Sequence, residues 1–313
     1  MSSLHLVDPE LAQILAQFPS FDINASTLAA VRTMDLPLDA PVAAEVSCVE
    51  RLLPSSSGAP DVRVLVYAPS SARPAPAVVH IHGGGYVMGR PEMHDARNRQ
   101  LAHDAGCVVM SVDYRLAPET PFPGGIEDCY TALLWMHRRA GEIGVDSRRI
   151  AISGESAGGG LAASLALLAR DRGEVCVCFQ QLIFPMIDDR TGSVGAPHPY
   201  AGEFLWTAAS NRYGWRSLLD GPPGGDGVSP YAAAARAQDL AGLPPTFIAV
   251  GALDLFVEEN IEYARRLIRA GVPTELHVYP GAFHGYLLAP QARVTLQADH
   301  DASTALRNAL ALR

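Results

Sequence analysis

The stretch GESAG at residues 154–158 carries the clearest chemical signal in the chain. It has the form G-x-S-x-G, in which a serine occupies a tight turn between a strand and a helix. The preceding run RIAISG is typical of a strand, and the following AGGGLAASLALLA is typical of a helix. Glycines on both sides let the backbones pass closely, so that Ser156 is lifted above the sheet at a helix N-terminus. This context predicts a nucleophilic serine and disfavours an incidental glycine-rich turn.

A second glycine-rich stretch, HGGGY at residues 82–86, follows the strand-like run AVVHI. Consecutive glycines cost conformational entropy, so a plain loop explains them poorly. Without side chains, successive backbone N–H groups can converge on one point, which is the geometry that stabilises the oxyanion of acyl transfer. We therefore expect Gly83 and Gly84 to donate to an oxyanion, with the N–H of Ala157 as a third donor.

The same strand offers a competing interpretation, because His80 and His82 would place two imidazoles on one strand face. A hydrolytic metal site needs further ligands at a regular spacing. The other histidines form no H-x-x-E-H motif and no comparable cluster in the sequence. We therefore expect no metal, with His80 in the sheet and His82 supporting the glycine loop. A metal-dependent hydrolase built on this pair is kept as an alternative.

A serine nucleophile needs a base and an acid that orients the base. When the serine sits on such an elbow, the acid and then the histidine follow it along the chain, each just after a strand. Asp254 follows the strand-like run TFIAVG, and His284 follows TELHVYPG. Alone, Asp254 could cap a helix and His284 could be a surface residue. Their joint position and order predict a triad of Ser156, His284 and Asp254.

The elements that must position these residues alternate, from about residue 60, between short apolar runs and longer helical patterns. Several runs are continuously apolar, as in strands that are covered on both faces. The alternation predicts an α/β fold with a mostly parallel central sheet flanked by helices. The expected strands span 61–69, 77–83, 107–114, 149–154, 175–184, 246–251 and 274–281, and the expected helices span 126–141, 157–171, 257–270 and 299–312.

Two segments interrupt this alternation. Residues 1–45 contain the amphipathic patterns LAQILAQF and ASTLAAVRTM with no strand nearby. Residues 189–228 are rich in glycine, proline and aromatic residues, and they separate two strands by more than a tight crossover needs. Long excursions in a compact α/β domain are usually lids or binding loops, and we expect that role here.

Composition narrows the functional classes. The 313 residues are 48% hydrophobic and 18% charged, which is typical of a folded chain with ample material for a core. No apolar run is long enough to span a membrane, and the first residues do not form the pattern of a signal peptide. The formal net charge of −9, without a basic cluster, argues against nucleic acid as a partner.

Two residue types sharpen this interpretation. All 24 cationic side chains are arginine, which excludes mechanisms that need a lysine amine, such as a Schiff base or a P-loop. The five cysteines are scattered through apolar stretches, as is typical of reduced thiols in a cytoplasmic protein. We expect Cys176 and Cys178 to point to one face of a strand.

At this point the chain resembles the bacterial hormone-sensitive-lipase-like esterases of the α/β-hydrolase superfamily. The resemblance covers roughly residues 60–290. It implies that Ser156 is the nucleophile, His284 the general base and Asp254 the orienting acid. The stretches that carry it are HGGGY (82–86), DYRLAPETPFP (113–123), GESAGGGLA (154–162), FPMIDDR (184–190), SPYAAAARAQDLAGLPP (229–245), GALDLFVEE (251–259) and YPGAFHG (279–285).

The resemblance also implies an α/β-hydrolase fold with a helical cap over the serine. Residues 1–45 and 190–220 would form the cap, and residues 46–189 and 221–313 would form the catalytic α/β domain. Glu155 stands where aspartate is commoner, and within YRLAPE we expect Arg115 and Glu119 to be architectural. The substrate pocket would be lined by Tyr86, Phe204, Leu205, Trp206 and Trp215, with a place in the core of the cap as the alternative for the aromatic residues of the 190–220 segment.

The resulting prediction is a carboxylesterase that acts on small, short-acyl esters through an acyl-enzyme, without metal or organic cofactor. An amidase or deacetylase with the same triad remains an alternative, since both reactions proceed through an acyl-enzyme. A non-catalytic small-molecule receptor on the same fold is a further alternative. The expected partner is a small-molecule ester, with no nucleic acid and no stable membrane anchor. The resemblance makes a homodimer plausible, and we expect a cytoplasmic location.

Overall fold

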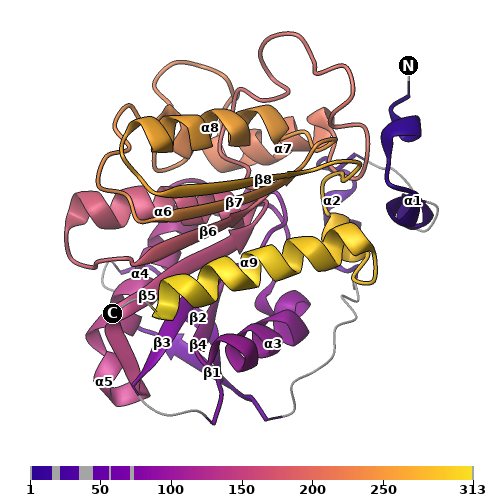
Figure 1. Cartoon of the computed structure of the whole chain (residues 1–313). Helices are drawn as coiled ribbons and strands as arrows, with labels where there is room; N and C mark the ends of the chain where they lie inside the picture. Colours follow the sequence, from indigo (N-terminus) through magenta and orange to yellow (C-terminus); the bar gives the residue numbers. More distant parts are fainter. Residues whose placement is uncertain (1, 16–21, 35–44, 56–57, 71–73, 312–313) are drawn as a thin grey trace.

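The computed structural model describes the chain apart from residues 1, 16–21, 35–44, 56–57, 71–73 and 312–313. Within that part, eight strands form one sheet in the order β1-β2-β4-β3-β5-β6-β7-β8 (Figure 1). Strand β2 pairs antiparallel with both β1 and β4, and all other neighbours are parallel. The strands are β1 (Ser47–Leu53), β2 (Val62–Ala68), β3 (Ala75–Ile81), β4 (Val108–Asp113), β5 (Val145–Glu155), β6 (Phe179–Ile183), β7 (Thr246–Gly251) and β8 (Thr274–Tyr279).

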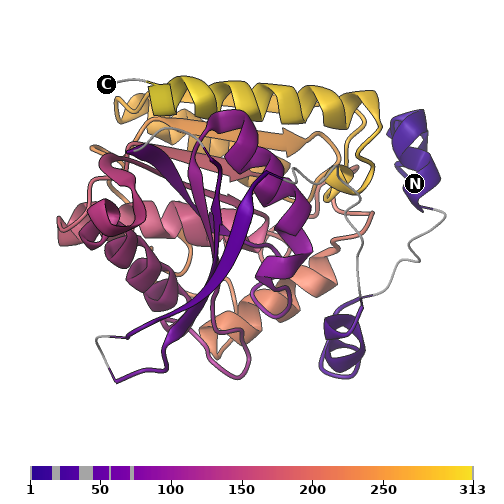
Figure 2. The same cartoon turned by 90° about the horizontal axis from the view of Figure 1, so that it is seen from below.

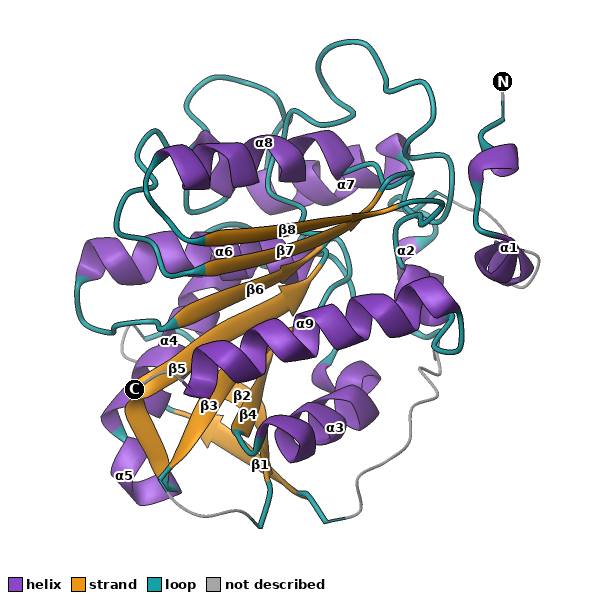
Figure 3. Ribbon diagram, in the orientation of Figure 1, coloured by secondary structure: helices purple, strands orange, loops and turns teal. Residues whose placement is uncertain are grey.

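Helices cover both faces of the sheet, and each face has its own hydrophobic cluster. Figure 3 shows α3 and α9 in front of the sheet, with α4 and α6 behind it, and Figure 2 shows the same layers from below. The α-helices in the described residues are α1 (Pro9–Leu15), α2 (Leu28–Arg32), α3 (Asp95–Ala105), α4 (Gly124–Arg138), α5 (Ala140–Ile143), α6 (Ala157–Arg172), α7 (Ala208–Leu219), α8 (Val257–Arg269) and α9 (Arg293–Ala311). This is the expected α/β-hydrolase architecture.

The parallel pairing explains how distant parts of the chain meet. Because β3, β5, β7 and β8 run in the same direction, their carboxyl ends lie at one edge of the sheet. The glycine loop, the GESAG turn and the loops that hold Asp254 and His284 follow these four strands. The candidate site is therefore assembled where ligands bind in open α/β sheets.

The N-terminal segment lies beside this edge, at the right of Figure 1. The amide of Asp8 donates to the carbonyl of Gly281, just after β8. The amide of Ile23 donates to Ser210 Oγ at 2.9 Å, which joins the segment to α7. The N-terminal residues and the 190–220 segment are thus in contact. Residues 16–21 and 35–44 lie outside the described residues, so the structure does not describe the chain just before the expected boundary at residue 45.

Several elements differ from the sequence expectation, and three of them have a clear physical reason. Strand β6 begins at Phe179, so Cys176 is exposed and Cys178 half-buried in an irregular connection, and the prediction that both share a strand face is wrong. Strand β1 was not predicted, because this edge strand is largely exposed and lacks a continuous apolar run. Helix α3 was not predicted either, because its DARNRQLAHDA sequence contains few apolar residues.

Candidate active site

Ser156 occupies a turn that only small neighbours permit. It connects β5 directly to α6 with φ 55° and ψ −121°, a positive φ that is costly for a residue with a Cβ atom. A Cβ atom at Gly158 would lie 2.0 Å from the carbonyl oxygen of Ile81, and one at Gly154 would lie 2.4 Å from the Gly158 backbone. The two glycines of the motif are therefore required by direct backbone contact, and the serine hydroxyl is held at the edge of the sheet.

Ser156, His284 and Asp254 form a continuous hydrogen-bonded chain. Ser156 Oγ lies 2.9 Å from His284 Nε2, and His284 Nδ1 lies 2.8 Å from Asp254 Oδ2. All three side chains are buried, and Asp254 is fully so. A carboxylate only accepts, so His284 Nδ1–H donates to it and Nε2 is left to accept the proton of the serine hydroxyl. The structure brings together the three residues that the sequence singled out.

The loop after β7 and nearby aromatic rings hold this chain in place. Asp254 Oδ1 accepts a hydrogen bond from the amide of Phe256 at 2.9 Å, which fixes the carboxylate. The rings of Phe184 and Phe256 meet the His284 ring edge-on, with centroids 4.9 and 5.1 Å away. The imidazole can therefore neither rotate nor exchange its partner without displacing buried rings.

The HGGGY loop passes directly beside the serine. A Cβ atom at Gly83 would lie 3.4 Å from Ser156 Cβ, and Gly84 has φ +123°, which a side chain would make unfavourable. Within the described residues, none of the amide groups of Gly83, Gly84 and Ala157 donates a hydrogen bond to another group of the protein. Three N–H donors without an internal acceptor thus stand close to the serine hydroxyl.

His82 supports this loop rather than the reaction. Its Nδ1–H donates to the carbonyl of Gly83 at 2.8 Å, and its ring stacks on Tyr114 at 4.3 Å between centroids. The hydroxyl of Tyr114 donates to the His82 carbonyl at 3.0 Å. Burial lowers the pKa of His82 to about 3, so the imidazole is neutral at physiological pH. These contacts of His82 and Tyr114 fix the conformation of the glycine loop.

A cavity of about 250 Å³ opens above Ser156 and His284. Leu205 and Trp206 line it, as the sequence suggested. Further apolar walls come from Phe184, Met88, Met93, Leu287 and Leu288 and, in the N-terminal segment, from Ile23, Val31 and Met34. The last three were not singled out, although the amphipathic pattern ASTLAAVRTM contains two of them and could have identified Val31.

Three of the expected pocket residues are placed elsewhere. Tyr86 is buried, donates its hydroxyl to the carbonyl of Met186, and packs on Trp215, which is fully buried. Phe204 packs on Phe283. None of the three lines the cavity. Large aromatic residues supply core as readily as pocket wall, and residue type alone does not separate the two uses.

The H-x-H pair does not form a shared metal site. His82 is engaged with the glycine loop, whereas His80 Nδ1 contacts Ser111 Oγ and His80 Nε2 contacts Glu155. Within the described residues, the one group of three or more donors that could hold an ion combines His80 with His94 and Glu155. His94 and Glu155 were not predicted as ligands, because each lies in a different stretch of the sequence from His80.

The comparisons with known proteins agree with this geometry. Residues 78–288 match the family model described as alpha/beta hydrolase fold. Esterase LipI of Mycobacterium tuberculosis is 37% identical over 290 residues, which cover 90% of this chain and 88% of that protein. Carboxylesterase NlhH of the same species is 35% identical over 294 residues, or 90% and 89% of the two chains. A solved bacterial heroin esterase has a TM-score of 0.89 and 40% identity, and the alignment covers 99% of this chain and 100% of that one.

Proposed function

This chain belongs to the alpha/beta hydrolase fold family, among its hormone-sensitive-lipase-like esterases, and is a carboxylesterase, and from this premise we propose that Ser156, His284 and Asp254 are its catalytic triad. The observation that supports the proposal is the unbroken contact from Ser156 Oγ through His284 to Asp254, with distances of 2.9 and 2.8 Å. This contact lies at the base of a small, largely apolar cavity.

In the first half of the reaction, His284 Nε2 takes the proton of Ser156 as Oγ bonds to the ester carbonyl carbon. The carbonyl oxygen becomes an oxyanion, which the amides of Gly83, Gly84 and Ala157 stabilise. Asp254 holds the imidazole in the tautomer that can accept this proton and stabilises the cation that results. The bond to the alcohol then breaks, and His284 gives its proton to the departing alkoxide. An acyl group remains on Ser156.

In the second half, His284 removes a proton from water as the water oxygen bonds to the acyl carbon. The same three amides stabilise the second oxyanion. Its collapse breaks the bond to Ser156 Oγ, which regains the proton from His284, and the carboxylic acid leaves. Every proton is returned, so the residues named here complete the cycle without a metal or an organic cofactor.

We further propose that the substrates are small esters with short acyl chains. The cavity volume of about 250 Å³ falls below the range of about 300–1,000 Å³ that is usual for drug-sized ligands. Trp206 and Met34 contribute bulk to the wall, and Leu205 contacts the same space. With p-nitrophenyl esters of increasing length, kcat/KM should peak at about two to four carbons and fall beyond, because longer chains exceed this volume.

A fluorophosphonate probe tests the triad directly. One equivalent should bond to each chain with loss of activity, and Ser156→Ala should abolish both labelling and hydrolysis. Labelling that persists in Ser156→Ala would contradict the assignment of the nucleophile. Activity that persists in this variant but is removed by a chelator would instead support a metal-dependent hydrolase.

Matched ester and amide substrates separate the remaining alternatives. Faster turnover of an acetate ester than of the corresponding acetamide is expected, because an amide carbonyl is less electrophilic and its amine leaves less readily than an alcohol. Stoichiometric labelling without turnover of either substrate would favour a small-molecule receptor on this fold.

We also propose that residues 1–45 and 190–220 form the cap and that the protein resides in a reducing compartment such as the cytoplasm. Ile23, Val31 and Trp206 reach the cavity from these two segments, which supports the cap. All five cysteines are free thiols, which supports the compartment. None of the helices in the described residues is long and apolar enough to cross a membrane. We propose in addition that the protein is a homodimer, and its mass in analytical ultracentrifugation tests this.

A further inference from the structure

Three side chains with metal-binding donors converge beside the nucleophile turn. They are His80 in β3, His94 just before α3 and Glu155 at the end of β5, and their donor atoms lie within 4.8 Å of one another. His80 Nε2 is 3.0 Å from Glu155 Oε2, and His94 Nδ1 is 3.9 Å from the same oxygen. Two ligands at about 2.1 Å from a tetrahedral ion are about 3.4 Å apart, which lies between these separations.

His94 shows that this cluster is incomplete without a further partner. Its Nδ1 atom is buried and, within the described part of the chain, has no hydrogen-bond partner, although it faces a carboxylate. Buried polar atoms are nearly always satisfied, and an orphaned one calls for an explanation such as a bound ion. An ion placed between His94 and Glu155 would bond to both and remove the unsatisfied atom.

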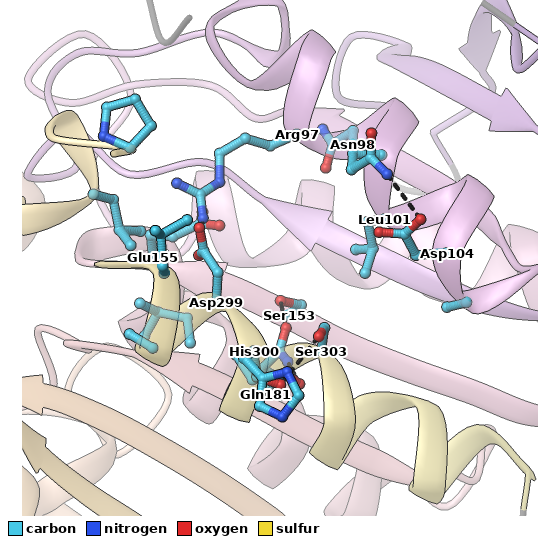
Figure 4. A pocket seen from close by; sticks show the side chains of 18 of the residues that line it. Arg97, Asn98, Leu101, Asp104, Ser153, Glu155, Gln181, Asp299, His300 and Ser303 are labelled. Carbon is cyan, nitrogen blue, oxygen red and sulfur yellow. Dashed lines mark hydrogen bonds and ion pairs between the residues drawn. The ribbon is translucent and has the colours of Figure 1, made fainter. Parts of the chain in front are cut away.

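The surroundings resemble the outer shell of a metal site. His80 Nδ1 contacts Ser111 Oγ at 3.0 Å and Asn98 Nδ2 at 3.3 Å, and these outer contacts hold the imidazole with its Nε2 atom toward Glu155. The nearest cation, Arg97, forms an ion pair with Asp299, and Figure 4 shows these two side chains facing each other beside Glu155. Asp299 thereby offsets part of the Arg97 charge that acts on Glu155.

The cluster is also reachable from solvent. Glu155 and Arg97 line both the catalytic cavity and a second cavity of about 520 Å³ between α3 and α9, which Figure 4 shows from close by. His80 faces the second cavity and His94 the catalytic one. The three donors therefore stand in the wall between two open spaces, which supplies the entry path that a metal site needs.

We propose that His80, His94 and Glu155 bind one divalent transition-metal ion of the Zn²⁺ class. Two imidazoles and a carboxylate form a donor set that zinc prefers, and a fourth position would remain for water. The ion would tie the end of β5, immediately before Ser156, to β3 and to the segment that leads into α3. Its role is to bind and to stabilise this turn, so that the proposal is independent of the triad assignment.

Metal binding is measured on the full-length protein after treatment with a chelator and dialysis. Zn²⁺ is followed by calorimetry, and Co²⁺ by its visible d–d absorption, which reports the coordination geometry. We expect one ion per chain and a rise in the thermal unfolding midpoint at saturating Zn²⁺, since a ligand that binds only the folded state stabilises it.

Four variants locate the ion. His94→Ala and Glu155→Gln should weaken binding by at least about tenfold, and Ser111→Ala by about tenfold through loss of the outer contact. His103→Ala, on the exposed side of α3, is the matched control and should bind as the unmodified chain does. Circular dichroism checks that each variant is folded. Because two ligand variants are measured, the test still holds if one of them does not fold.

Three outcomes would overturn the proposal. Absence of saturable binding would show that the cluster is held by hydrogen bonds alone. Binding that His284→Ala abolishes but His94→Ala leaves intact would place the ion on the catalytic histidine. Equal binding by the unmodified chain, His94→Ala and Glu155→Gln would place it elsewhere on the surface.

Discussion

At the scale of single residues, the glycines around Ser156 are set by contacts rather than by flexibility. A Cβ atom at Gly160 would lie 2.0 Å from the Met186 carbonyl oxygen and 2.4 Å from the Tyr86 hydroxyl. Tyr86 in turn donates to that same carbonyl. The glycine run at the start of α6 therefore lets the loop after β6 approach, and that loop places the Phe184 ring in T-shaped contact with His284.

Asp254 should matter for catalysis far more than for folding. Asp254→Asn keeps the oxygen that accepts from the Phe256 amide, but its NH₂ group would face His284 and stabilise the wrong tautomer. We expect kcat to fall by about 10⁴-fold, the size of effect seen when a triad carboxylate becomes an amide. Steady-state kinetics on a short p-nitrophenyl ester measures it.

Asp239→Asn, at an exposed position, is the control and should be active. Unfolding in urea checks that the Asp254 variant retains its stability. A fall of less than about tenfold in kcat would show that His284 does not depend on this carboxylate.

Glu259 should make stability depend on pH. It lies in the first turn of α8, and its Oε1 accepts from the amides of Ile187 and Asp188, while its Oε2 is buried without a partner in the described residues. Burial raises its pKa well above the ordinary value. The stability that this group contributes is therefore fully present below the unfolded-state pKa of about 4.3 and is lost as pH rises toward the folded-state pKa.

Glu259→Gln removes that titration and keeps an acceptor for the two amides. Relative to the unmodified chain, the variant should gain stability between pH 5 and pH 8, by at most about 1.4 kcal/mol per pH unit. Urea unfolding at the two pH values provides the comparison. Glu258→Gln, at the exposed neighbouring position, should show no such gain, and an identical pH profile for both variants would contradict the assignment.

At the scale of elements, helix α2 is attached by the polar contacts of Arg32 as well as by its buried residues Leu28 and Val31. Arg32 donates to the carbonyl of Val87 at 2.7 Å and to that of Ala117 at 3.0 Å, and it forms a two-fold ion pair with Glu119. Val31, its neighbour, lines the catalytic cavity. Glu119 of the YRLAPE stretch is thus architectural, and it acts by holding the segment that covers the site.

Arg32→Ala should therefore loosen one wall of the cavity. We expect KM for a short ester to rise about tenfold while kcat changes less, because the wall contributes to binding more than to the chemical step. Glu119→Gln is the matched variant. It removes only an exposed charge, worth about 0–1 kcal/mol, and should change KM by less than about fivefold. Equal effects of both variants would show that the ion pair, not the backbone contacts, holds α2.

The elements that sequence predicts best are those whose residues meet one dominant demand. Strand β7 is buried throughout and apolar after Thr246, because helices cover it on both faces, and its predicted bounds coincide with the observed ones. Helix α6 combines a strong turn signal with small residues and was placed within one residue. Helix α3 escaped prediction because it packs through few apolar contacts and presents polar residues to a cavity.

At the scale of the whole molecule, the order of the strands decides what can be foreseen. The positions of Asp254 and His284 follow from chain order alone, because each lies in the loop after a strand of the same parallel set. The cavity wall does not follow from chain order. It joins residues of α2 to residues near 205, and these two segments lie far apart in the sequence. The resemblance implied that Tyr86 and Trp215 belong to that wall, yet packing between layers places them in the core.

The net charge of −9 should make anionic substrates less favourable than neutral ones. A field of this sign repels anions over distances of about the Debye length, so that it slows their approach at low ionic strength. Inside the cavity, Glu155 adds a carboxylate, and Arg97 is already paired with Asp299. An ester that carries a free carboxylate should therefore be a poorer substrate than a neutral ester of the same length.

Salt separates this long-range effect from the fit of the cavity. For ethyl hydrogen succinate, kcat/KM should rise about two- to fivefold between 0.01 and 0.5 M NaCl, because the Debye length falls from about 30 Å to below 8 Å. For ethyl butyrate, which is neutral, it should stay constant within about 1.5-fold over the same range. A parallel rise for both esters would point to an effect of salt on the protein itself. A fall for the anionic ester would show that a local cation, with Arg97 the nearest candidate, outweighs the net charge at the site.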